Sequence, residues 1–245
     1  MRVVTLNLWK NEGDLPARLQ MLVAECRHLK PDIICLQEVY ADAEFDTGAW
    51  LAQALGLSVT SVPARMKQRS GVLSSSGLAL LSSLPLLSQE SLNLPTSAAD
   101  GGRKALFGSF ETSLGPVRIV SLHLSHLNTD EGEQLRQLQL STIWSWVREG
   151  WEHPIILAGD FNAKIDAPCL SWLQTQAQLV GTDSLLPGET SLRDRPGALI
   201  DHVVLAGQNR VQLSHTALCF KEMEAEAGRV ASDHFGIVAD FDAIG

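Results

Sequence analysis

The segment Pro154–Asn162 begins as an apolar run and ends abruptly in polar residues. Ile155–Ala158 has the length and aliphatic composition of a strand that is buried on both of its faces. Gly159 allows a tight backbone turn, which leaves Asp160 and Asn162 at the end of this strand. Because burying an unpaired carboxylate is strongly unfavourable, Asp160 requires a metal ion, a phosphate-bound water or a histidine nearby. We therefore expect this strand end to carry chemistry.

The composition of the 245-residue chain is typical of a soluble globular enzyme, with 45% hydrophobic and 19% charged residues. The length suffices for a sizeable core. Because the sequence contains no repeat, low-complexity tract or linker-like stretch, we expect one domain over residues 1–245. With 19 basic and 28 acidic residues, the net charge is −9. This charge disfavours nucleic acid as a general partner but leaves a local basic groove open.

The four cysteines, Cys26, Cys35, Cys169 and Cys219, show no close pairing of the metal-binding or redox type. Their apolar surroundings predict buried free thiols, which suit a reducing compartment. No signal-like start is present, and no window approaches the ~18 apolar residues of a membrane span. We therefore expect a cytoplasmic protein without a transmembrane segment, and the sequence indicates no obligate protein partner.

Two helices are well marked in the sequence. The first follows the candidate N-cap Asp14, has Pro16 in its first turn and ends before Pro31. The second is expected over Glu131–Glu149, with Asp130 as its candidate cap.

Strand-like runs recur along the whole chain. The connections Leu84-Pro85 and Leu114–Pro116 are short and predict hairpins. Many strands with few helices predict an α/β fold in which mixed sheets are covered by helices. The strand-like runs are Val3–Leu8, Ile33–Gln37, Leu78–Leu81, Ala105–Phe110, Val117–Leu124, Ile155–Ala158, Leu199–Leu205 and Gly236–Phe241.

Further polar residues share one kind of position, at the end or edge of an apolar strand. Each has an ordinary explanation by itself. Asn7 could cap a strand, Glu38 could begin a solvated loop, and His123 could be a hydrogen-bonded core histidine. Asp201 and Asp233 could be turn residues. Because sheets with parallel strands gather their strand ends at one rim, all of them together predict a single site. The residues concerned are Asn7, Glu38, His123, Asp160, Asn162, Asp201, His202, Asp233 and His234.

The residue types of this predicted site favour phosphate-ester hydrolysis. Its carboxylates are hard oxygen ligands that suit Mg²⁺ or Mn²⁺ better than zinc. Histidines beside carboxylates suit general acid–base work or stabilisation of a charged transition state. The sequence has no phosphate loop, dinucleotide fingerprint or zinc-protease motif. Ser232, Asp233 and His234 are consecutive, so they cannot align as a hydrolase triad.

Six short motifs surround these polar residues. They are Thr5-Leu6-Asn7, Leu36-Gln37-Glu38-Val39, Ser121-Leu122-His123-Leu124, Gly159-Asp160-Phe161-Asn162, Ile200-Asp201-His202-Val203 and Ser232-Asp233-His234. In this order they resemble the endonuclease/exonuclease/phosphatase superfamily, which includes DNase I, repair nucleases, neutral sphingomyelinases, inositol polyphosphate phosphatases and deadenylases. The resemblance implies a DNase I-like, four-layer α-β-β-α sandwich of two packed mixed sheets flanked by helices. It also implies a divalent-metal-dependent hydrolase of phosphodiesters or phosphomonoesters.

The resemblance further implies roles for individual residues. Glu38 would be the principal ligand of Mg²⁺ or Mn²⁺, with Asn7 beside it and Asp233 near the metal. Asp160 would activate or orient the attacking water, and Asn162 would hold that water or the phosphate.

The remaining roles concern the phosphate itself. His234 would contact the scissile phosphate, and Asp201 would fix the tautomer of His234. His123 matches a histidine of the DNase I and sphingomyelinase branches. Arg103 follows a Gly-Gly turn and is a candidate substrate-binding residue, although surface solvation is the ordinary alternative for it and for Lys104.

The substrate stays open between phosphate esters in general and DNA or RNA. Trp9 stands where repair nucleases carry another acid, which argues against a second metal ion there. Its ring could instead line the site and stack on a base. Only one tyrosine, Tyr40, is present, and no match is found for the side chains that DNase-like enzymes lay along DNA. A binding module that has lost the chemistry is disfavoured, because the full set of acid, amide and histidine residues is present.

One stretch could recruit an anion. Ser61–Ser76 contains Arg65, Lys67 and Arg69 but no acid, and its glycine and serine content predicts a mobile loop. A merely solvated basic loop is the alternative.

Overall fold

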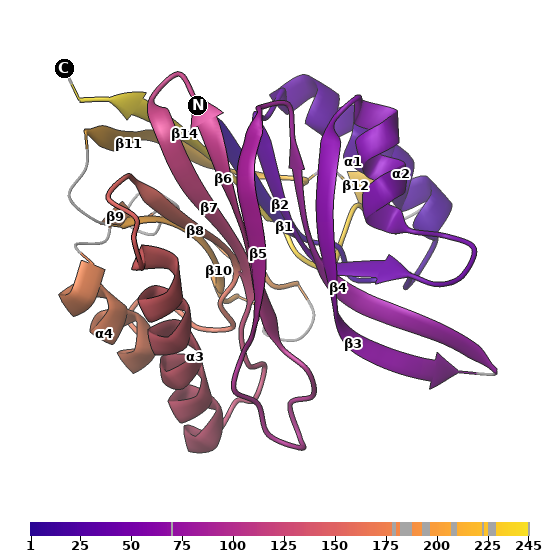
Figure 1. The fold of residues 1–245 in the computed structure, drawn as a ribbon. Coiled ribbons are helices and arrows are strands. Elements are labelled where there is room, and N and C mark those ends of the chain that lie inside the picture. Colours follow the sequence, from indigo (N-terminus) through magenta and orange to yellow (C-terminus); the bar gives the residue numbers. More distant parts are fainter. Residues whose placement is uncertain are drawn as a thin grey trace.

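The fold was determined as a computed structural model that describes residues 1–69, 71–177, 180–181, 188–192, 197–206, 210–221, 223–224 and 229–244. Within these residues two six-stranded sheets face each other, and helices cover both outer faces (Figure 1). Each sheet contains one parallel pair among antiparallel pairs, so both sheets are mixed. The predicted four-layer α-β-β-α arrangement is therefore confirmed.

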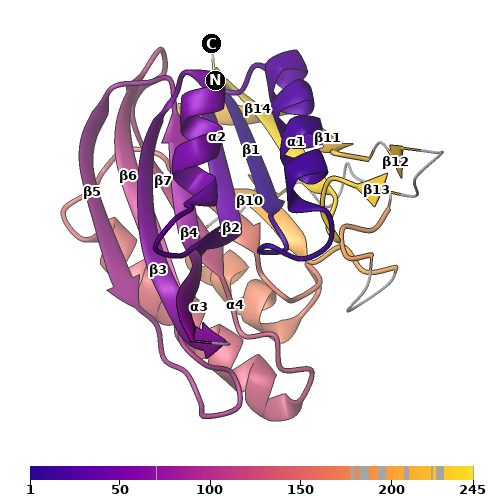
Figure 2. The same ribbon diagram turned by 90° about the vertical axis from the view of Figure 1, so that its right-hand side faces the viewer.

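The first sheet places the C-terminal strands beside the N-terminal ones. In spatial order it contains β11 (Val211–Cys219), β14 (Gly236–Ala243), β1 (Arg2–Asn7), β2 (Ile33–Ala41), β4 (Val72–Ser82) and β3 (Ser58–Arg69). The helices α1 (Leu15–Leu29) and α2 (Thr47–Leu55) lie on its outer face (Figure 2).

The second sheet is built from one continuous part of the chain. Its order is β5 (Leu86–Asn93), β6 (Lys104–Thr112), β7 (Gly115–His123), β8 (Ile155–Asp160), β10 (Asp201–Ala206) and β9 (Val180–Gly181). The helices α3 (Asp130–Arg148) and α4 (Pro168–Ala177) cover its outer face. A separate small ribbon consists of β12 (Met223–Glu224) and β13 (Arg229–Val230).

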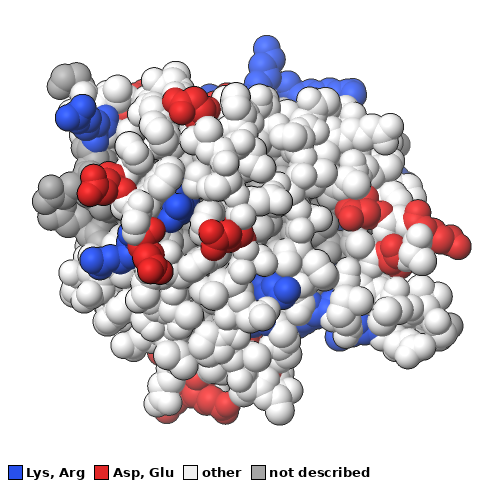
Figure 3. All heavy atoms as spheres, viewed as in Figure 1, with Lys and Arg blue, Asp and Glu red and all other residues white. Residues whose placement is uncertain are grey.

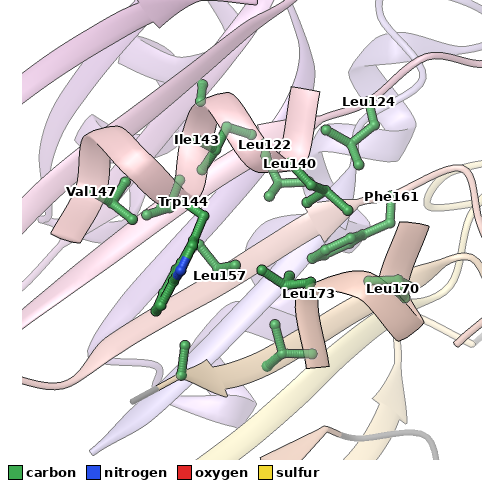
Figure 4. Packing of buried hydrophobic residues seen from close by; sticks show 14 of the residues in the cluster. Leu122, Leu124, Leu140, Ile143, Trp144, Val147, Leu157, Phe161, Leu170 and Leu173 are labelled. Atoms are coloured by element: carbon green, nitrogen blue, oxygen red, sulfur yellow. The ribbon is translucent and has the colours of Figure 1, made fainter. Parts of the chain in front are cut away.

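Three apolar layers hold the sandwich together. Between the two sheets, side chains such as Ile33, Ile156 and Phe241 are fully enclosed. Figure 4 shows the layer under α3 and α4, where Ile143 and Leu173 belong to one cluster with residues of the second sheet. Strands enclosed on both faces read as continuous apolar runs, which is why their positions could be predicted.

Two β-α-β units determine where the strand ends lie. The helix α1 connects β1 to the parallel strand β2, and α3 connects β7 to the parallel strand β8. In each unit both parallel strands end at the same edge of their sheet. The two units therefore bring the ends of β1, β2, β7 and β8 to one rim of the sandwich.

The ends of the predicted helices agree largely with the structure. Asp14 caps α1 by accepting a hydrogen bond from the Ala17 backbone N–H at 3.2 Å, as predicted. For α3 the predicted cap is wrong by one residue, because Thr129 rather than Asp130 accepts the bond from the Gly132 N–H at 3.2 Å. Asp130 is the first helical residue, where a negative charge favours the helix dipole.

Two connections differ from the predictions. Ser61–Ser76 does not form a loop, since it belongs to β3 and β4, which pair as a long antiparallel hairpin. Ser70 and the Arg69 side chain lie outside the described residues. Leu84-Pro85 does not close a hairpin either, because it leads from β4 in the first sheet to β5 in the second. The turn at Leu114–Pro116 does join the antiparallel strands β6 and β7, as predicted.

All four cysteines are buried and free, as their surroundings predict. Among the described residues, none of the helices combines the length and apolar character needed to span a membrane.

Candidate active site

The rim described above borders a cleft of about 390 Å³. Asn7 and Glu38 from the first sheet line this cleft together with His123 and Asp160 from the second. Asn162, Arg103, Asp233 and His234 line it as well. Among the residues predicted for the site, Asp201 and His202 are outside the cleft lining. Both are buried, and Asp201 contacts His234.

Asp160 lies at the centre of the site. Its register partners are His123 on the parallel strand β7 and Asp201 on the antiparallel strand β10. Its Oδ2 accepts a hydrogen bond from Asn7 Nδ2 at 3.1 Å, and its Oδ1 accepts one from the Asn162 backbone N–H at 2.9 Å. Burial and the nearby charge of Asp201 raise the pKa of Asp160. The acid thus has the polar partners that its position requires.

His234 and Asp201 form a buried pair beside Asp160. The distance between His234 Nδ1 and Asp201 Oδ2 is 2.8 Å. Burial alone would lower the pKa of His234, but the carboxylates of Asp201 and Asp160 raise it to about 10. His234 is therefore an imidazolium at neutral pH, with Nδ1 directed to Asp201 and Nε2 free of that contact.

His123 differs from His234 in charge. Burial, with the positive charges of Arg103 and Arg65, holds the pKa of His123 well below its ordinary value. Its Nε2 lies 3.4 Å from Asp160 Oδ2. The neutral ring can hold the Asp160 carboxylate in place, but it does not neutralise its charge.

Unusual backbone conformations gather at this cleft. Of the six non-glycine residues with positive φ among those described, Trp9, Lys10, Glu38 and Asn162 are here, with φ between 47° and 55°. Such conformations cost about 1–3 kcal/mol each and persist where the surrounding structure imposes them. Glu38 sits at a β-bulge, since the register between β2 and β4 shifts around it. Trp9 lines the cleft, with the Arg18 guanidinium 4.9 Å from the centre of its ring.

The oxygen atoms in the cleft fit a divalent cation. The Glu38 carboxylate already has one cation as its neighbour, because its Oε2 lies 3.1 Å from the Lys10 Nζ. Asn7 Oδ1 accepts one hydrogen bond from the Trp9 N–H at 3.0 Å and keeps a second lone pair. Asp233 lines the same cleft, and the carboxylate and amide oxygens of these three residues are of the kind that Mg²⁺ and Mn²⁺ prefer.

A second group of potential ligands is more tightly spaced. Ligand atoms of Asp160, Asp201 and His234 all lie within 4.8 Å of one another, and Asp201 Oδ1 is buried without a hydrogen-bond partner among the described residues. This group differs from the predicted ligands Glu38, Asn7 and Asp233. The single positive charge of the His234 imidazolium balances one of the two carboxylates.

Arg103 is braced by residues that the sequence analysis missed. Its Nη2 donates to Asp100 Oδ1 at 2.9 Å, and the Asp100 side chain is fully enclosed. His126 Nδ1 lies 2.8 Å from the same Asp100 oxygen, and Arg65 Nη2 lies 3.7 Å from it. One sequence signal was available, since Asp100 precedes Arg103 by three residues across the Gly-Gly turn.

Thr190 was also missed. Its Oγ1 accepts hydrogen bonds from the backbone N–H groups of Ile200 and Asp201 at 3.0 and 3.1 Å. Its carbonyl accepts the Phe235 N–H at 2.8 Å. Thr190 therefore ties the start of β10 to the segment that carries His234, and no sequence pattern indicates this role.

The comparisons with known proteins agree with this geometry. A structure of an endonuclease/exonuclease/phosphatase from Beutenbergia cavernae DSM 12333 is similar over 100% of this chain and 72% of its own, with a TM-score of 0.82 and 22% identity. The human Nocturnin catalytic domain with bound sulfate covers 99% of this chain and 93% of its own, with a TM-score of 0.76 and 21% identity.

A third structure, D. rerio TDP2 with a single-strand DNA product, covers 99% of each chain, with a TM-score of 0.77 and 18% identity. No curated protein matches the chain. The model of the Endonuclease/Exonuclease/phosphatase family matches residues 4–234. The chain therefore belongs to the endonuclease/exonuclease/phosphatase family, and its fold is that of the phosphoesterases and nucleases of this family.

Proposed function

We propose that the protein is a Mg²⁺- or Mn²⁺-dependent phosphoesterase that hydrolyses a phosphodiester or phosphomonoester by attack of water. The observation that carries this proposal is the position of Asp160. Its carboxylate lies in hydrogen-bond contact with Asn7 and close to the His234–Asp201 pair, in the same cleft as Glu38. A carboxylate that can act as a base for water, a cationic donor and oxygen ligands in one cleft support this proposal.

In the proposed reaction Asp160 orients the attacking water and takes up its proton. The contacts from Asn7 and from the Asn162 backbone fix the carboxylate in its plane. His234 donates from Nε2 to a phosphate oxygen, because its Nδ1 is turned toward Asp201. Arg103 adds positive charge to the cleft wall.

Glu38, Asn7 and Asp233 would hold the divalent cation. When bound, it supplies neutralisation of the negative phosphate oxygens. We expect Glu38→Gln to weaken Mn²⁺ binding at least about tenfold. Even the loss of a residue that only hydrogen-bonds to a metal ligand lowers metal affinity about 10- to 100-fold. Electron paramagnetic resonance titration of Mn²⁺ without substrate measures this affinity.

The matched variant for this test is Asp201→Asn, which alters the more tightly spaced cluster instead. Its Mn²⁺ affinity should stay within about threefold of the unaltered protein, a difference below 1 kcal/mol. If Asp201→Asn loses Mn²⁺ while Glu38→Gln retains it, the metal belongs to the Asp160–Asp201–His234 cluster.

Nucleic acid is the alternative substrate. The Trp9 ring in the cleft wall could stack on a base, and the similar D. rerio TDP2 was solved with a single-strand DNA product. The net charge of −9 argues against binding of a long duplex. The face seen in Figure 3 agrees with this, because its charged residues are dispersed and much of its surface is uncharged.

A substrate panel separates these possibilities. Plasmid DNA, single-stranded RNA, sphingomyelin and inositol phosphates would each be incubated with metal, with the Asp160→Asn variant as the control. Turnover of DNA alone would replace the general phosphoesterase proposal by a nuclease.

A further inference from the structure

A second, smaller cavity of about 30 Å³ lies beside the catalytic cleft. Its described lining contains three cations and several hydroxyl groups but no carboxylate. We call it the basic pocket, and it is defined by Lys10, Asn11, Tyr40, Arg65, Lys67 and Ser74–Ser76. Its size suits a compact group such as a phosphate better than a base or a sugar ring.

The strand register builds this pocket. Tyr40 in β2, Ser76 in β4 and Arg65 in β3 are partners in one row across three strands. Lys67 and Ser74 are partners two residues further along the hairpin. Because residues two apart share a face of a strand, this register brings Arg65 and Lys67 to the same face. The hairpin that carries them extends beyond the rest of the first sheet (Figure 1).

The basic pocket is continuous with the cleft, because Lys10 and Arg65 line both cavities. Two backbone carbonyls hold the Arg65 guanidinium in place. Its Nη2 donates to the Asp100 carbonyl, and its Nε lies 3.4 Å from the Gly102 carbonyl. Lys67 belongs to the basic pocket and not to the cleft lining. A ligand that spans both cavities therefore meets the catalytic residues at one end and Lys67 at the other.

The chemistry of the pocket matches an anion with several oxygens. Two ammonium groups and a guanidinium form strong, charge-assisted hydrogen bonds to phosphate. Ser74 and Ser75 donate only at 3.4 Å to backbone carbonyls, so their hydroxyls can turn to a ligand at small cost. The Tyr40 hydroxyl donates to Asp42 at 2.6 Å, which makes its ring a fixed wall. Lys10 and Arg65 lie 3.1 Å from Glu38 and 3.7 Å from Asp100, so Lys67 adds the positive charge that attracts an anion to this place.

We propose that the basic pocket binds a second phosphate group of the substrate, so that the preferred substrate carries a phosphate next to the scissile ester. The proposal rests on the proposed function, since the cleft supplies the site of the first phosphate. Such a pair of phosphates occurs in two kinds of substrate. One is a nucleic-acid single strand with a neighbouring phosphate, and the other is a small molecule with two phosphates.

The test uses Lys67→Glu, with Lys67→Arg to restore the charge and Lys221→Glu as a matched exposed control outside both cavities. Binding of non-hydrolysable probes is measured by titration calorimetry with Mg²⁺. The first arm compares a phosphonate-linked dinucleotide with and without a 5′-phosphate. The second compares propane-1,3-diyl bisphosphonate with propylphosphonate.

We expect Lys67→Glu to weaken binding of the probes with two phosphate or phosphonate groups at least about tenfold, the effect of losing one charge-assisted contact. Binding of the probes with one such group should change less than about twofold, and Lys67→Arg should restore binding. An effect on the dinucleotide alone identifies a nucleic-acid strand as the source. Weaker binding of the bisphosphonate as well shows that the pocket recognises a pair of phosphates without a nucleoside. Equal binding by Lys67→Glu and the unaltered protein in both arms overturns the basic pocket as a phosphate site.

Hydrolysis is measured separately on bis(p-nitrophenyl) phosphate, which has a single phosphate. If the unaltered protein hydrolyses no phosphate ester, the proposed function fails, while Lys67-dependent binding still supports the pocket. If hydrolysis is normal and the second phosphate adds no Lys67-dependent affinity, the pocket proposal alone fails.

Discussion

Replacing His234 by alanine is expected to reduce metal-dependent phosphodiester hydrolysis by about 10² to 10⁴-fold, the usual contribution of a positioned acid–base group. The imidazolium is the cationic donor of the cleft, and its removal also leaves Asp201 without its 2.8 Å partner. Asp160→Asn should have an effect of the same order, because an amide of nearly equal shape cannot take a proton from water. Steady-state hydrolysis of bis(p-nitrophenyl) phosphate with Mg²⁺ or Mn²⁺ measures both effects, and a chelator should abolish the activity.

Matched controls exist on the surface of the same chain. His215→Ala and Asp242→Asn change an exposed histidine and an exposed aspartate outside the cleft, so the rate should not change. Circular dichroism melting curves separate a catalytic loss from unfolding. Full activity in folded His234→Ala and Asp160→Asn would show that these residues are not the catalytic ones.

Replacing Asp100 by alanine is expected to lower the free energy of unfolding by about 3–5 kcal/mol at pH 7, the usual cost of breaking a buried ion pair. The Asp100 carboxylate is fully enclosed between Arg103, His126 and Arg65. Its loss leaves the buried Arg103 guanidinium without its carboxylate partner, with His126 Nδ1 still 2.8 Å from Nη2. Urea denaturation of the variant measures the change, and Asp242→Ala is the exposed control.

The same prediction has a pH dependence of known sign. Burial would raise the pKa of Asp100, but hydrogen bonds and charge from Arg103, with hydrogen bonds from His126, hold it below its ordinary value. A carboxyl group whose pKa is lower in the folded state stabilises the fold at pH values above its unfolded-state pKa, which is about 3.9. This stabilisation is lost as the pH falls through the folded-state pKa. The stability difference between the two proteins should therefore be full at pH 7 and shrink below about pH 4. A difference that stays constant to pH 3 would exclude the charge of Asp100 as its cause.

The strand ends of the site could be predicted because each one interrupts an apolar run. Asn7, His123 and Asp160 end strands that are largely buried, and Glu38 lies at the bulge where the continuous buried part of β2 ends. Such apolar runs can be recognised in the sequence alone, and parallel pairing then brings the ends of the strands together.

The hairpin β3–β4 could not be predicted in the same way. Its serines and glycines are typical of turns, and the start of β4 has no alternating pattern because it is exposed or half-buried. Pairing with β2 across the sheet overrides this local preference. Contacts such as Asp100 with Arg65, or Thr190 with Asp201, join segments distant in sequence, and a single sequence does not encode them legibly.

The strand order also determines when the site comes into existence. β14 pairs with β1 at the centre of the first sheet, although one strand ends the described chain and the other begins it. During synthesis on the ribosome, His234 and β14 emerge after all the other site residues. Asn7 and His234 can line one cleft only after β14 has paired with β1. A prematurely terminated product that ends before His234 therefore has neither a complete first sheet nor a complete cleft.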